Sequence, residues 1–262
     1  MRTEKELITS LRARQLLLKN VANRPLKPKV IKKYAQAMRE GRWVPNGATI
    51  CLNRKGELID GQHRLSAIIA TDLSFEMLIV YDLPDNAFAS IDSGSVRSGG
   101  DVLAVIGEKN YSRLCAVLPF IDRYYNGTLD EYVRYDNDQI LELNKKYPDV
   151  KEVLSISNKA SKGFIHPRVL AACFYLFSKV DARLADDFIE KVVEGVNVVK
   201  GSSWWYLRER LTRNFTAKAK LSPIYVMALC IKAWNATRRG MAGRYLAWRE
   251  TGEKAEAFPT IV

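Results

Sequence analysis

Cysteine and histidine are scarce in this sequence. Its 262 residues include four cysteines, widely spaced, and two histidines. Zinc sites and redox pairs need such residues at close, regular spacing, so neither kind of site is expected. We expect free, buried thiols, as is typical of proteins in the reducing cytoplasm. These thiols belong to Cys51, Cys115, Cys173 and Cys230.

Long hydrophobic runs are missing as well. No stretch of about 18 apolar residues occurs, so no membrane span is expected. The first twenty residues are polar and amphipathic, without the apolar block of a signal peptide. The motifs of P-loop proteins, dinucleotide-binding domains and serine hydrolases are also absent. With 47% hydrophobic and 27% charged residues, the composition is that of a globular protein of one or two domains.

Acidic residues are outnumbered, and the excess positive charge is uneven. The chain has 41 basic and 29 acidic residues, a net charge of +12. Residues 1–42 hold twelve basic and three acidic residues. Residues 200–250 hold eleven basic and two acidic residues. Clustered cations favour the phosphates of nucleic acids, so DNA is a predicted partner. The candidate contacts in the second block are Arg208, Arg210, Arg213, Arg238 and Arg239.

Aromatic residues are interleaved with the cations of residues 200–250. Bases could stack on these rings, which would suit nucleic-acid binding. Aromatic residues at helical spacing also form the core of helical domains, and the sequence does not decide between the two. A third possibility is that tryptophans anchor an acidic protein partner. The anchors would be Trp204, Trp205 and Trp248.

The first part of the chain mixes helical and strand patterns. Apolar spacing predicts a helix over residues 3–19. A second helix begins at Pro28 and is ended by Gly41. Strands are predicted at residues 49–52, 57–59 and 75–81. Further helices are predicted at residues 64–70, 85–91 and about 99–106.

After Gly107 every predicted element is helical. The predicted helices cover residues 111–125, 136–147, 167–179, 183–195, 203–215 and 222–238. Asp138 and Ser222 are candidate helix starts, and His166 is more typical of a helix start than of a catalyst. The predicted class is therefore α+β. We expect an N-terminal helix (1–20), an α+β domain (21–107), an all-α domain (108–250) and a tail (251–262).

The most informative motif is Asp60-Gly61-Gln62-His63-Arg64, between a predicted strand and a predicted helix. A helix start offers unpaired N–H groups and the positive end of its dipole, and Gly61 lets a ligand approach closely. His63 and Arg64 add donors, so the motif favours an anion, most plausibly a nucleotide phosphate. Asp60 could hold a divalent cation, orient His63 or cap the helix. A strand–glycine–helix turn without any ligand remains the alternative.

A second loop, residues 92–100, repeats this pattern of small residues and hydroxyls with one cation, Arg97. The loop could close over the same ligand. The alternative is a capped turn in which Asp92 bonds locally, and this alternative is favoured for Ser93 and Ser95.

The motif at residues 60–64, called the box below, follows a predicted hairpin and begins a predicted helix. It resembles the corresponding motif of the ParB/sulfiredoxin superfamily, in the branch with the sequence Asp-Gly-Gln-His-Arg. The likeness covers residues 21–107. Over nearly the whole chain, the sequence is similar to uncharacterised phage and bacterial ParB-like proteins. The stretches that carry this likeness begin at Asn23, Gly41, Asp60, Ile91, Lys232 and Ala257.

The resemblance implies a ParB/sulfiredoxin-like domain that binds a nucleoside triphosphate, followed by the all-α domain. His63 stands where ParB has the first of two arginines, which favours ATP over CTP. No cysteine adjoins the box, so reduction of a sulfinic acid is excluded. Asn23-Arg24 resembles the segment that begins the ParB nucleotide pocket. The phosphate-binding candidates are therefore Arg24, Gly61, Gln62, His63, Arg64 and Arg97.

We expect the protein to hydrolyse ATP or transfer its phosphoryl group, acting on or with DNA in the cytoplasm of a bacterium or a phage-infected cell. Asp60 and His63 are the candidate catalytic residues, and Asp60 is the candidate ligand for Mg²⁺. Nuclease action is a subsidiary version, because one acidic residue is little support for a two-metal site. The alternative is a non-catalytic DNA-binding protein that uses residues 1–42 and 200–250.

Overall fold

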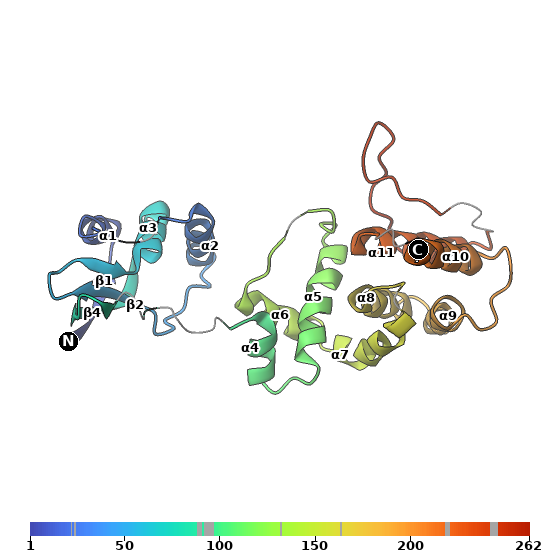
Figure 1. Ribbon diagram of the computed structural model, residues 1–262, viewed down its shortest axis with the longest axis horizontal. Coiled ribbons are helices and arrows are strands. Elements are labelled where there is room, and N and C mark those ends of the chain that lie inside the picture. Colours follow the sequence, from blue (N-terminus) through green and yellow to red (C-terminus); the bar gives the residue numbers. More distant parts are fainter. Residues whose placement is uncertain are drawn as a thin grey trace. The chain divides into compact units, whose positions relative to one another are not determined.

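A computed structural model describes residues 1–21, 23, 25–87, 91, 97–131, 133–162, 164–217, 221–241 and 246–262. The chain divides into two compact units, Met1–Val96 and Arg97–Val262 (Figure 1). The described residues of the first unit form a mixed sheet and helices, whereas those of the second unit form helices and no strand. The expected α+β class is therefore confirmed.

The sheet of the first unit has four strands in the order β1-β4-β2-β3. Strand β1 pairs antiparallel with β4, β4 pairs parallel with β2, and β2 pairs antiparallel with β3. The two outer strands thus both run against their neighbours. The strands are β1 (Arg2–Ile8), β2 (Thr49–Asn53), β3 (Leu58–Asp60) and β4 (Phe75–Leu83).

Three helices lie on one side of these strands, with α3 between α1 and α2 (Figure 1). Their bounds are Ser10–Leu17 for α1, Pro28–Arg39 for α2 and Gln62–Thr71 for α3. Alternate residues of the strands face the helices because side chains in a strand point to opposite faces in turn. The resulting core includes Ile8, Leu16, Met38, Ile50, Leu65, Ile68 and Ile79.

The predicted helix over residues 3–19 is wrong for its first half. Residues 2–8 form strand β1, and α1 begins only at Ser10. The reason is tertiary pairing, since β1 bonds along the whole edge of β4, from Arg2 opposite Tyr81 to Ile8 opposite Phe75. A local signal marks the change, because the Thr9 hydroxyl accepts the backbone N–H of Arg12 and caps α1.

The second unit is helical and has its own core. At its centre the rings of Phe177 and Trp234 stack, with centroids 4.1 Å apart, and Phe188 meets Phe177 edge-on. Helix α4 packs on α5 and α6, so it belongs to this unit. The elements are α4 (Gly99–Val105), α5 (Tyr111–Tyr125), α6 (Asn137–Lys146), α7 (Val150–Val153), η2 (Leu154–Lys162), α8 (Pro167–Ser178), α9 (Ala182–Phe188), η3 (Ile189–Glu194), α10 (Ser203–Thr216) and α11 (Pro223–Arg238).

Most predicted helices of this unit are confirmed to within two residues, because their ends carry recognisable caps. The Ser222 hydroxyl caps α11 by accepting the N–H of Tyr225, and His166 caps α8. Helix α6 begins at Asn137, and its N-cap is Asp136, two residues before the candidate start at Asp138; the backbone N–H of Asp136 donates to the Gln139 side chain. Elements α7 and η2, at residues 150–162, were not expected.

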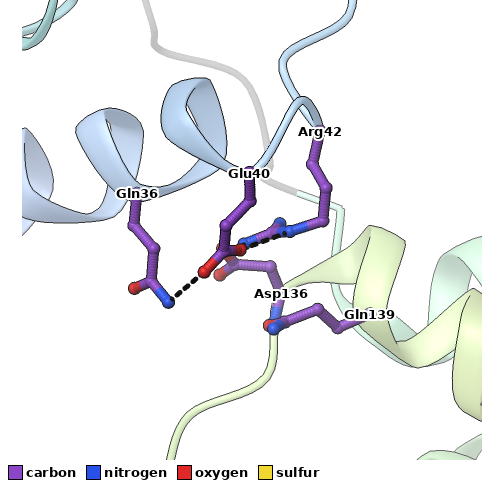
Figure 2. A network of polar contacts seen from close by, with 5 residues as sticks. All are labelled: Gln36, Glu40, Arg42, Asp136 and Gln139. Carbon is purple, nitrogen blue, oxygen red and sulfur yellow. Dashed lines mark hydrogen bonds and ion pairs between the residues drawn. The ribbon is translucent and has the colours of Figure 1, made fainter. Parts of the chain in front are cut away.

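Figure 2 labels Gln36, Glu40 and Arg42 at the carboxyl end of α2. The Gln36 side chain donates to the Glu40 carboxylate over 2.8 Å, and Arg42 pairs with the other oxygen of the same carboxylate. These contacts stabilise the last turn of α2 at the point where Gly41 ends it in the left-handed conformation (φ 69°).

Free thiols and the lack of a membrane span were both expected. All four cysteines are free, with three of them buried and Cys115 partly buried. Among the described residues, no helix combines the length and the hydropathy needed to cross a bilayer.

Candidate functional site

The expected strand–glycine–helix junction is present where β3 meets α3. Gly61 joins them with a φ of 104°, a conformation that residues with a side chain rarely adopt. A Cβ atom at this position would also lie 3.1 Å from Cγ1 and 3.2 Å from Cα of Ile50 on β2. Glycine is therefore required here both by the backbone angle and by the close packing of the junction against β2.

Arg64 and Asp60 form an ion pair within the box. The Arg64 Nη2 atom lies 2.7 Å from Oδ2 of Asp60 and 2.5 Å from the backbone carbonyl oxygen of Thr49. The two side chains are 13% and 21% exposed. The Nε atom of Arg64 is buried and makes no hydrogen bond. The guanidinium is thus held at the junction between β2, β3 and α3, with its buried Nε donor unused.

His63 contacts the start of α2 instead. Its Nε2 atom accepts the backbone N–H of Lys27 over 3.0 Å, so Nε2 carries no proton in this arrangement. The imidazole is 7% exposed. His63 and Arg64 were expected to point their donors at one anion, but in this structure each has a different internal partner.

The remaining polar residue of the box, Gln62, anchors the segment that follows α1. The Asn20 side chain donates to the Gln62 amide oxygen over 3.1 Å. Asn23 donates to Asn20 and to the backbone carbonyl of Leu58 on β3. The described residues between α1 and α2 are therefore bonded to Gln62 at Asn20, to β3 at Asn23 and to His63 at Lys27. The sequence did not predict these contacts, although Asn23 was one of the residues that carried the family resemblance.

Helices α2 and α3 lie side by side and run in the same direction. Lys27 meets His63 at their N-terminal ends, and at the opposite ends the Arg39 side chain donates to the carbonyl oxygen of Ala70 over 2.8 Å. The positive ends of two helix dipoles therefore lie together. Neither N-terminus has a side-chain cap, and neither first turn contains an acidic residue.

Exposed lysines increase the positive potential at this end of the two helices. Lys27, Lys29 and Lys32 come from the residue before α2 and from its first turns, and all are exposed. Cations normally destabilise a helix N-terminus, where acidic residues are favoured. A bound anion would compensate for these lysines and for both dipoles.

Two phosphate-binding candidates are not placed beside the box. Arg24, with the greater part of the second loop (Asp92–Val96), lies outside the described residues. Arg97 is exposed at the start of the second unit, where its carbonyl oxygen accepts the Asn137 side chain over 2.9 Å. The role predicted for Arg97 stays a prediction.

The arginines proposed for DNA fall into two groups. Arg208 is partly buried: its Nη1 atom donates to the carbonyls of Val192 and Val193, and its guanidinium lies over the Phe164 ring. Arg210 is also partly buried, and its Nε atom makes no hydrogen bond. The exposed group consists of Arg213, Arg238 and Arg239.

Most of the aromatic residues near these arginines belong to the core. Trp204, Trp234 and Trp248 are 3%, 0% and 6% exposed, so they cannot stack on bases at the surface or anchor a protein partner. Trp205 is only partly buried. The alternative in which these rings form the core of a helical domain is therefore confirmed for the three buried tryptophans.

One cavity lies outside the box. Its volume is about 210 Å³, and the ring of Trp43 lines it together with strands β1 and β4. None of its lining residues belongs to the box. The lining includes Lys5, Trp43, Pro45, Asn46, Glu76 and Leu78.

The described residues contain no group of three or more potential metal ligands among histidine, cysteine and acidic side chains. Asp60, the candidate for Mg²⁺, is paired with Arg64. Comparison with known protein families, with curated proteins and with solved structures finds no match to this chain.

Proposed function

We propose that the first unit is a ParB/sulfiredoxin-like domain that binds a nucleoside triphosphate, with ATP favoured, at the adjoining N-termini of α2 and α3. The observation that carries this proposal is the hydrogen bond from the Lys27 backbone to His63. It holds together two helix N-termini that have neither a side-chain cap nor an acidic residue in the first turn. Such ends attract phosphate groups.

Each residue of the site then has a physical role. The amide of Lys29, the amides in the first turn of α3 and the Lys27 and Lys29 side chains would surround the phosphate oxygens. His63 positions the two helices, and Gly61 allows the turn into α3. Arg64 has an unused buried donor, which fits an additional phosphate oxygen. Asp60 would contribute a carboxylate for Mg²⁺ only after release from Arg64.

The activity that best fits such a site is hydrolysis of the triphosphate or transfer of its terminal phosphoryl group. Catalysis of phosphoryl transfer depends mainly on positioning and on stabilisation of negative charge, both of which helix N-termini and cations supply. Turnover is measured as ADP formed from ATP, with and without DNA, because both hydrolysis and phosphoryl transfer leave ADP. A protein that binds ATP but forms no ADP under either condition would contradict the proposed activity and leave nucleotide binding alone.

Calorimetric titration with ATP, CTP and GTP in the presence of Mg²⁺ tests the binding. We expect micromolar affinity for ATP in the wild type and at least a tenfold loss in Lys27→Glu, about 1.4 kcal/mol. Arg54→Glu is the matched control, because Arg54 is exposed in the turn between β2 and β3, at the end of β3 opposite Gly61. Folded wild-type protein that binds no nucleotide would refute the proposal.

A second candidate function is DNA binding by the second unit. It is supported by the exposure of Arg213, Arg238 and Arg239 near the ends of α10 and α11. The logarithm of the affinity for duplex DNA should fall with the logarithm of the salt concentration, by about 0.9 for each phosphate contacted. Replacing the three arginines by alanine should reduce that slope. An unchanged slope and affinity would exclude these residues as the DNA contact.

A further inference from the structure

The Arg64–Asp60 pair uses the guanidinium incompletely. Both hydrogen bonds of Arg64, to Asp60 and to the Thr49 carbonyl, leave from the single atom Nη2. The adjacent Nε atom is buried without any partner. A guanidinium binds an oxyanion best side-on, through two nitrogens and two oxygens. The carboxylate of Asp60 instead contacts it through one oxygen and one nitrogen.

The unused Nε donor leaves one hydrogen bond of Arg64 that an anion oxygen could accept once the Asp60 carboxylate has moved. A buried donor without a partner is unfavourable, and an oxygen placed on Nε would remove that cost. A tetrahedral phosphate group carries several oxygens and up to two negative charges, so it can contact Nε and a second guanidinium nitrogen together. It would therefore bond Arg64 better than the Asp60 carboxylate does.

We propose that Asp60 is a built-in competitor for phosphate at Arg64, and that binding of a phosphate or pyrophosphate group displaces its carboxylate. This inference rests on the function proposed above, because it concerns the phosphate side of the same box. In the unliganded protein Asp60 neutralises Arg64 and keeps it in place. Singly charged anions such as acetate gain too little to displace it, so the pair selects multiply charged phosphates.

A different role for Asp60 makes the opposite prediction. If its carboxylate instead served mainly to hold a metal ion beside the phosphates, Asp60→Asn would weaken the binding of phosphate ligands. A competitor, by contrast, strengthens binding when it is removed. Measurements without metal isolate the competition, because the carboxylate then has no cation to hold.

The test is calorimetric titration with inorganic pyrophosphate in the absence of divalent cations, comparing the wild type with Asp60→Asn. Asparagine keeps the size of the side chain and can still accept a bond from Arg64, so the fold should persist. We expect about tenfold tighter binding in the variant, because the ion pair with Arg64 is replaced by a weaker hydrogen bond to a neutral amide oxygen. Asp60→Ser, which shortens the side chain, is the second variant, and circular dichroism checks that each is folded.

The outcomes separate this inference from the proposed function. If the wild type binds pyrophosphate and both variants bind it equally or more weakly, the competition is refuted while the phosphate site stands. If neither the wild type nor either folded variant binds pyrophosphate, both the competition and the proposed function are refuted. Tighter binding that persists in the double variant Asp60→Asn, Arg64→Gln would also refute the competition, because the gain must depend on Arg64.

Discussion

The backbone N–H of Lys27 lies 3.0 Å from Nε2 of His63, and this hydrogen bond joins the N-terminal ends of two parallel helices. Lys27 supplies the donor, its backbone N–H, and His63 supplies the acceptor, its Nε2 atom. Lys27 precedes a proline-started helix without a side-chain cap, and His63 lies in the first turn of α3. The bond thus couples the box to the basic segment before it, two parts of the sequence that are 36 residues apart.

Replacement of His63 should show how much this bond stabilises the first unit. His63→Leu removes the acceptor and leaves the Lys27 N–H without a partner, which should lower the free energy of unfolding by about 1–2 kcal/mol. His63→Gln offers an amide oxygen as a new acceptor and should recover part of the loss. Urea denaturation of both variants measures the difference. Equal stability of the leucine variant and the wild type would show that the bond contributes nothing.

Gly61 should tolerate substitution less well than Gly56, although both have a positive φ. At Gly56 a Cβ atom would meet no other atom within 4 Å, whereas at Gly61 it would meet Ile50 at 3.1 Å. Gly56→Ala should cost about 1 kcal/mol of stability from backbone strain alone, and Gly61→Ala about 2–3 kcal/mol. Thermal and urea denaturation of the two variants give the comparison. Similar losses would mean that the junction can move away from β2.

Arg208 should matter for stability, unlike the exposed arginine five residues later on the same helix. Arg208→Ala removes the donor to two backbone carbonyls of η3 and should destabilise the second unit by about 1–3 kcal/mol. Arg213→Ala should change the free energy of unfolding by less than about 0.5 kcal/mol, because Arg213 is exposed. If Arg208→Ala lowers the affinity for DNA and leaves the free energy of unfolding unchanged, the stabilising role assigned to Arg208 is wrong.

Asp122 should make the second unit sensitive to acid. Burial tends to raise the pKa of Asp122, but hydrogen bonds from Lys146, Tyr135 and Tyr147 outweigh it and hold that pKa below its ordinary value. The carboxylate therefore stabilises the fold fully above the unfolded-state pKa of about 4. This stabilisation is lost as the pH falls through the lower pKa of the folded protein.

Unfolding free energies measured between pH 7 and pH 2 test this expectation. The wild type should lose stability below about pH 4. Asp122→Asn should be less stable at neutral pH and less dependent on pH across the acid range. Asp130→Asn, at an exposed position, is the matched control and should follow the wild type. A pH profile of Asp122→Asn that parallels the wild type would contradict the assignment.

Much of the local structure could be predicted because its signals are local. Pro28 and Ser222 start helices, Gly41 ends one, and the strand–Gly61–helix junction follows from the residues themselves. The strand at residues 2–8 could not be predicted in this way. Its apolar residues fit a helix as well as an edge strand, and only its pairing with β4 decides.

The sequence predicted where in the chain the candidate site lies, but not which residues its side chains contact. Asp60, His63 and Arg64 could be singled out, but their partners Thr49 and Lys27 come from other elements and leave no pattern near the box. Cations at the surface and cations bonded inside, such as Arg213 and Arg208, are likewise indistinguishable in sequence. Arg208 differs from Arg213 because the fold places two backbone carbonyls of η3 within reach of the Arg208 guanidinium.

The central claim is that phosphate groups bind at the N-termini of α2 and α3, and backbone amide NMR tests it most directly. In a titration of ¹⁵N-labelled protein with ATP and Mg²⁺, the largest shift changes should fall on Lys27, Lys29, Val30 and residues 61–65. Asp60→Asn should show the same pattern. Changes confined to α10 and α11, or none at ATP concentrations in the millimolar range, would contradict the claim and leave the box as a structural junction.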